Sequence, residues 1–63
     1  MKIVKQLPAG EYTVIEVSEK TSFGNYAVID GKEYATEIAY DLPNCIGIKG
    51  SEDFAGKDVS FHD

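Results

Sequence analysis

Arginine is absent from this 63-residue chain, in which six lysines stand against eleven acidic residues. The formal net charge is therefore −5 at pH 7. Proteins that bind duplex nucleic acid usually present a basic surface, and they use the planar guanidinium group to read guanine or to clamp phosphate. The composition therefore argues against sequence-specific recognition of duplex DNA.

Cysteine is scarce as well, because Cys45 is the only one. A lone thiol cannot close an intramolecular disulfide, which excludes the cross-linked scaffold of small secreted proteins and fits a reducing compartment. The apolar run in residues 1–10 is too short and too interrupted for a signal peptide or a membrane span. We expect a soluble, cytoplasmic protein with no membrane partner.

Motifs for catalysis and metal binding are also missing. There is no Cys-x-x-Cys, His-x-x-x-His or EF-hand spacing, and no phosphate-binding loop. Cys45 and His62 are the one conceivable nucleophile and base, but no third residue is identifiable to orient them. Cys45 is instead expected to be a small buried hydrophobic residue. We expect a non-enzymatic protein without a cofactor or a bound metal ion.

What the chain does contain is strand-forming sequence, because β-branched and aromatic residues dominate residues 10–40. We expect five or six strands, at residues 1–7, 11–20, 25–29, 32–36, 45–48 and 57–61. A flat sheet of this kind would leave unprotected edges, whereas a barrel removes the edges and buries one face. The sequence predicts an all-β fold, with residues 1–63 forming one small antiparallel barrel, OB-like or SH3-like.

The turn dipeptide Asp30-Gly31 predicts a hairpin between two of these strands. Two registers are open. A two-residue type I′ loop places Ala27 opposite Tyr34, whereas a three-residue loop with a glycine bulge places Tyr26 opposite Tyr34.

Two irregular features are expected elsewhere. The apolar positions of residues 11–20 change side between Val14 and Ile15, which predicts a bend or a β-bulge there. The spacing of Ile38 and Leu42 allows one short helical turn before Pro43 stops it.

The two ends of the chain give simpler patterns. Residues 1–7 predict an edge strand that ends at Pro8, with Ile3 and Leu7 on one face. Near the other end, Phe54 is expected to pin a tight polar corner formed by residues 51–56.

The order of the motifs resembles a known family. LPAGEYTVIEV begins a long strand, a loop with SFG follows, and then come YAVI, a DGK turn, KEYATEIAYDL, IGIKG and GKDVSF. This order resembles small phage-type or plasmid-type OB-fold proteins that bind single-stranded DNA, whose first strands often run as G-x-Y-x-V, an aromatic and glycine loop, and Y-x-V. The resemblance covers most of the chain and implies a shallow groove across the second and third strands.

In such proteins the bases stack on exposed aromatic rings and lysines follow the backbone, so that arginine is not required. The resemblance gives these roles to five residues, Lys20, Phe23, Tyr26, Lys32 and Tyr34. The charge departs from the family's pattern, because carboxylates lie among the same positions, at Glu19, Asp30, Glu33 and Glu37.

Three functions are consistent with these observations. The first, which is the leading hypothesis, is weak binding of single-stranded nucleic acid, without strong sequence preference, around Phe23, Tyr26 and Tyr34; the other two are alternatives. The second is an acidic module that binds another protein, by an exposed strand edge or by offering carboxylates to a basic partner. An inhibitor of mobile-element origin that imitates nucleic acid is one version of it. The third is an assembly domain that forms a homo-oligomer through an edge strand. The net charge of −5 favours the acidic module that binds another protein.

Overall fold

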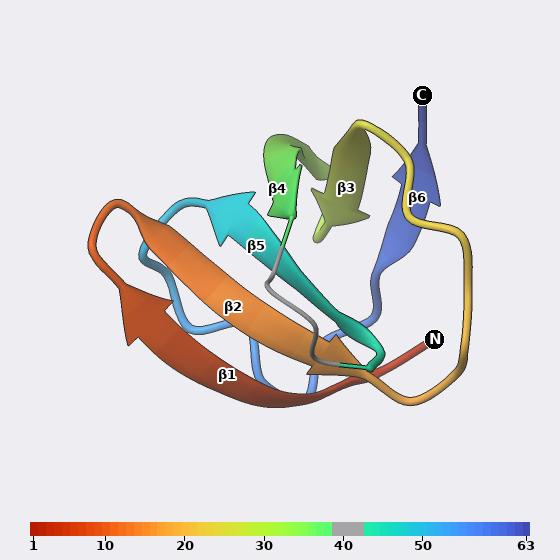
Figure 1. Cartoon of the computed structure of the whole chain (residues 1–63), viewed down its shortest axis with the longest axis horizontal. Coiled ribbons are helices and arrows are strands. Elements are labelled where there is room, and N and C mark those ends of the chain that lie inside the picture. Colours follow the sequence, from red (N-terminus) through yellow and green to blue (C-terminus); the bar gives the residue numbers. More distant parts are fainter. Residues whose placement is uncertain (39–42) are drawn as a thin grey trace.

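The computed structural model describes residues 1–38 and 43–63 (Figure 1). The strands are β1 (Ile3–Ala9), β2 (Tyr12–Val17), β3 (Tyr26–Ile29), β4 (Lys32–Ile38), β5 (Cys45–Lys49) and β6 (Ser60–His62). They form one antiparallel sheet in the order β1-β2-β5-β4-β3-β6, which confirms the predicted all-β fold. The residues described include no helix, and so none that could cross a membrane. Ile38, the first residue of the pair whose spacing allowed a helical turn before Pro43, is the last residue of β4, and the rest of that turn falls on residues 39–42, outside the described part.

Strand β4 connects the two halves of the sheet. Residues 32–35 pair with β3, whereas residues 36–38 pair with β5. The sheet therefore rolls up, with β1, β2 and β5 on one side and β3 and β6 on the other (Figure 1). Its two ends meet at a bridge between Lys2 and Asp58, where the amide of Ile3 donates to the carbonyl of Lys57 at 2.9 Å. This bridge joins the ends without a full ladder, so the sheet is barrel-like but not closed.

The hairpin adopts the first of the two predicted registers, because Ala27 lies opposite Tyr34. The turn residues Asp30 and Gly31 have φ angles of 53° and 77°. Two consecutive positive φ angles define a type I′ turn, whose twist matches that of the flanking strands. Glycine adopts this conformation without strain, and aspartate tolerates it.

Strand β2 lacks the predicted bend. Its residues alternate without a phase change, and Thr13, Ile15 and Val17 are buried. Thr13 takes an inward position because its hydroxyl donates to the carbonyl of Gly50 at 2.7 Å, which satisfies the buried polar group. The expectation was wrong because it treated threonine as an outward-facing residue.

The irregularity lies in β1 instead, where the register with β2 shifts between Ile3 and Lys5. A β-bulge of this kind reverses which side chains face the core. Ile3 is buried, whereas Leu7 is 62% exposed, so the prediction that they share a face was wrong. The strand also continues through Pro8, which an edge strand tolerates.

Among the residues whose burial the structure describes, nine hydrophobic ones form the core: Ile3, Ile15, Val17, Ala27, Ile29, Ile46, Ile48, Phe54 and Val59. Phe54 is the largest of them and is 1% exposed, as predicted for the residue that pins the corner at residues 51–56. Cys45, which was expected to be buried, is only half-buried.

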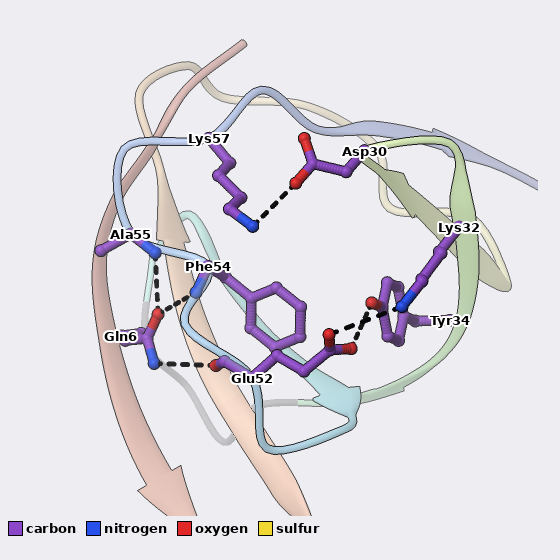
Figure 2. A network of polar contacts seen from close by, with 8 residues as sticks. All are labelled: Gln6, Asp30, Lys32, Tyr34, Glu52, Phe54, Ala55 and Lys57. Carbon is purple, nitrogen blue, oxygen red and sulfur yellow. Dashed lines mark hydrogen bonds and ion pairs between the residues drawn. The ribbon is translucent and has the colours of Figure 1, made fainter.

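The same corner is held against β1 by one side chain (Figure 2). Gln6 Oε1 accepts hydrogen bonds from the backbone amides of Phe54 at 2.5 Å and Ala55 at 2.8 Å. Gln6 Nε2 donates to the carbonyl of Glu52 at 3.2 Å. These contacts replace ladder hydrogen bonds at the edge of the sheet, and they place Phe54 over the core.

Candidate functional site

The two tyrosines of the predicted nucleic-acid site lie on opposite faces of the sheet. Tyr26 is paired with Ala35, and Ala27 is paired with Tyr34. Paired residues project to the same side and adjacent residues to opposite sides. Tyr26 is therefore on the outer face, with 40% of its surface exposed, while Tyr34 packs toward the core beside the buried Ala27.

Phe23, the loop aromatic, packs inward. Its ring meets the edge of Phe61 at a centroid distance of 4.9 Å, and it lies against the core. The loop comes this close to β6 because residue 24 is glycine: a Cβ on Gly24 would clash with the backbone carbonyl group of His62. The hydroxyl of Thr36 donates to the carbonyl of Gly24 at 2.8 Å and holds the loop in place.

Glu52 contacts the polar groups of two further residues of the predicted nucleic-acid site (Figure 2). The hydroxyl of Tyr34 donates to Glu52 Oε2 at 2.5 Å, and Lys32 Nζ lies 3.7 Å from Glu52 Oε1. The structure therefore brings Lys32 and Tyr34 together, but not with Phe23 or Tyr26. Their role in nucleic-acid binding stays a prediction.

Ion pairing also lowers the positive charge of the surface. Within the described part of the chain, three of the six lysines lie in ion pairs, Lys2 with Asp58 (3.3 Å), Lys32 with Glu52 (3.7 Å) and Lys57 with Asp30 (2.7 Å). Exposed pairs of this kind add little stability, but each one places a carboxylate beside an ammonium group. Lys20, the remaining predicted residue, is exposed in the loop after β2.

The hydrogen bond between Tyr34 and Glu52 gives a prediction in the alkaline range. This bond, then burial and the Glu52 charge, raises the pKa of Tyr34 from 10.0 to about 12. Because the pKa of Tyr34 is higher in the folded state, the protonated Tyr34 stabilises the fold. This contribution is fully present below about pH 10 and is lost as the pH rises through about 12. Titration by phenolate absorbance should show a late phase from Tyr34, which disappears in Tyr34→Phe and shifts to lower pH in Glu52→Gln. An unchanged titration curve in Glu52→Gln would contradict this assignment.

The sequence did not single out the outer face of β1, β2 and β5. Leu7 is paired with Val14, and Val14 with Gly47, so these three residues, here called the apolar row, occupy outward positions. Leu7 is 62% exposed, Val14 is half-buried and Gly47 is buried. The alternation of residues 1–7 could not reveal this face, because the bulge in β1 turns Leu7 outward.

A cavity of about 300 Å³ lies beside the apolar row. Its lining includes Leu7, Val14, Pro43 and Cys45, with Lys5 and Glu16 as charged residues. This volume is at the lower end of small-molecule sites. Within residues 1–38 and 43–63, no three histidine, cysteine, aspartate or glutamate residues gather as metal ligands.

Cys45 in this cavity is a weak nucleophile. Burial, followed by the Glu16 charge, raises the pKa of its thiol, while Lys5 opposes the shift. A raised pKa lowers the thiolate fraction at neutral pH, so we expect slower labelling by a thiol reagent than for an unfolded control. Glu16→Gln should accelerate labelling and Lys5→Gln should slow it, each by less than about tenfold because exposed charges are screened. Equal rates in both variants would disprove this electrostatic account.

No protein-family model, curated protein or solved structure matches the chain.

Proposed function

We propose that this protein is a non-catalytic module that binds another protein through the outer face of β1, β2 and β5. The proposal rests on the apolar row, in which Leu7 stays 62% exposed beside Val14 at the cavity. Covering an exposed leucine side chain contributes about 1.5–3 kcal/mol, and grouped exposed apolar residues commonly mark binding surfaces.

Charge complementarity indicates the chemistry of the partner. The chain carries a net charge of −5, and carboxylates pair with Lys2, Lys32 and Lys57. Such a surface attracts a basic protein at long range and repels an acidic one. We therefore propose a partner that presents one apolar side chain to the cavity from within a positively charged surface.

The two other functions have less support. For binding of single-stranded nucleic acid, Phe23 is half-buried and packs against the core, and Tyr34 lies on the face opposite Tyr26. For self-association, two copies would each bring a charge of −5, and this repulsion opposes contact.

Site-specific photocrosslinking in cell lysate tests the proposal. A photoreactive residue in place of Leu7 should capture a basic protein, whereas the same residue in place of the exposed Ser51 should not. Capture in pull-down should be lost in Leu7→Lys. It should persist in the matched control Val4→Lys, which adds the same charge to a 50% exposed residue of the same strand.

Two results would count against the proposal. Equal recovery of the protein by the wild type and Leu7→Lys would show that the apolar row is not the binding surface. Salt-sensitive binding of a labelled oligothymidine, with no protein captured, would support the nucleic-acid function instead.

A further inference from the structure

We infer that His62 is a pH-sensitive latch, which holds the short strand β6 on the rest of the sheet when its imidazole ring carries a proton on each nitrogen. The latch lies on the outer face of the sheet, because His62 is paired with Tyr26 and both side chains are exposed. This place is separate from the apolar row, so the inference does not depend on the function proposed above.

Strand β6 has few other contacts to hold it. It lies at the end of the sheet, and among the described strands it pairs with β3 alone. Its inward side chain is Phe61, which is only half-buried and meets the ring of Phe23 at a centroid distance of 4.9 Å. Segments with few buried contacts open locally at a low cost in free energy. A single side-chain contact can therefore change how often β6 opens.

Both nitrogens of the His62 ring face an oxygen atom. Nε2 lies 2.7 Å from Glu33 Oε2, and Nδ1 lies 3.0 Å from the backbone oxygen of Asp63. Carboxylate and backbone oxygens are acceptors, whereas the neutral imidazole has one N–H donor and one acceptor nitrogen. In the neutral ring one of the two contacts would therefore join two acceptors. Only the protonated ring donates to both oxygens at once, so this arrangement is the one that the imidazolium form stabilises.

The contact with Glu33 crosses the whole width of β3. His62 lies opposite Tyr26, and Glu33 lies opposite Val28, so a ring on β6 reaches a carboxylate on β4. The ring also stacks on Tyr26, with centroids 5.5 Å apart, and an aromatic face within about 6 Å attracts a cation. Protonation therefore ties the last strand of the sheet to its second neighbour, in addition to the ladder with β3.

The groups around His62 favour its protonated form. The titratable residues that contact it are Glu33 on β4 and Tyr26 on β3, with Asp63 beside it in the chain, while the adjacent loop presents Gly24. The backbone oxygen of Asp63, and then the Glu33 carboxylate, raise the pKa of His62 above 6.5. Because this pKa is raised in the folded state, the latch is fully formed below about pH 6.5 and is lost as the pH rises through the folded-state pKa.

Opening of β6 acts on a second cavity, of about 440 Å³, in which residues 23–25 form one wall. Gly24 lies against the backbone of His62, and the ring of Phe23 packs on that of Phe61, so β6 supports this wall. We therefore expect a rise in pH to loosen the wall and to expose both phenylalanine rings to solvent.

Amide hydrogen exchange of the full chain tests the inference, when it is followed by nuclear magnetic resonance and corrected for the intrinsic effect of pH. Protection of the β6 amides should fall about two- to fivefold as the pH rises through the pKa of His62, a modest step because the ion pair is exposed. The amides of β2 should show no such step. The ring signals of His62 report its pKa in the same samples, and this pKa should be higher than in the chain unfolded by urea.

Four variants assign the step. His62→Phe keeps a ring beside Tyr26 but cannot be protonated, so the step should disappear. Glu33→Gln should lower the pKa of His62 and shrink the step. The matched control Glu37→Gln removes an exposed carboxylate from the same face of β4 and should keep the step. Leu7→Lys should also keep it, which separates this inference from the proposed function.

Equal protection of β6 across this pH range in the wild type would overturn the inference. A step that persists in His62→Phe would overturn it too, because the titrating group would then be another one. The amino group of Met1, which lies 3.4 Å from the carbonyl oxygen of Val59 next to β6, is the nearest alternative that this variant tests.

Discussion

Replacing Phe54 with alanine is expected to lower the free energy of unfolding by about 3–5 kcal/mol. The side chain is 1% exposed, and its ring meets Tyr34 edge to face at a centroid distance of 5.2 Å. Truncation removes apolar burial and leaves a cavity under the corner at residues 51–56. Because small domains have a total stability of about 5–15 kcal/mol, a large share of the stability should be lost.

Urea denaturation followed by circular dichroism measures this loss. Tyr34→Phe is the matched control, since it keeps the aromatic pair and removes only the hydrogen bond to the exposed Glu52, so we expect a loss below about 1 kcal/mol. A loss below about 1 kcal/mol for Phe54→Ala as well would show that the corner contributes little to the core.

Replacing Gly24 with alanine should cost about 2–3 kcal/mol, because the added methyl group has no room. Its carbon would lie 2.5 Å from the carbonyl carbon of His62 and closer still to the carbonyl oxygen, so the backbone must move. The movement would strain the hydrogen bond from Thr36, the contact of Phe23 with Phe61, and the pairing of β3 with β6.

Gly31→Ala separates steric from conformational effects. Gly31 has a φ of +77°, but nothing lies within 4 Å of the position that a Cβ would take there, so we expect a loss of about 1–2 kcal/mol from backbone strain alone. Thermal unfolding compares the two variants. A Gly24→Ala protein as stable as the wild type would mean that the loop does not lie against β6.

Prediction from the sequence succeeded where the determining interactions are local. The type I′ turn at Asp30-Gly31 depends on the φ angles that two adjacent residues accept, and the strand pattern depends on side-chain alternation. Phe54 could be assigned to a buried corner because an aromatic residue stood alone among polar ones. The all-β fold follows from many such local preferences acting in the same direction.

Prediction failed where a distant group decides the outcome. Thr13 faces inward because its hydroxyl donates a hydrogen bond to the carbonyl of Gly50, 37 residues away. Gln6 on β1 likewise accepts a hydrogen bond from the amide of Phe54, 48 residues further along the chain. The aromatic face expected around Phe23, Tyr26 and Tyr34 was not assembled, since one hairpin register sends the two tyrosines to opposite sides.

The strands, the turn and the negative charge therefore follow from local sequence, because backbone sterics and composition act without tertiary contacts. The exposure of Leu7 and Tyr26 and the half-burial of Phe23 were settled by tertiary contacts instead. Those outcomes depend on a bulge, a register and the close approach of Gly24 to β6, each of which is fixed by packing between segments that are far apart in the chain.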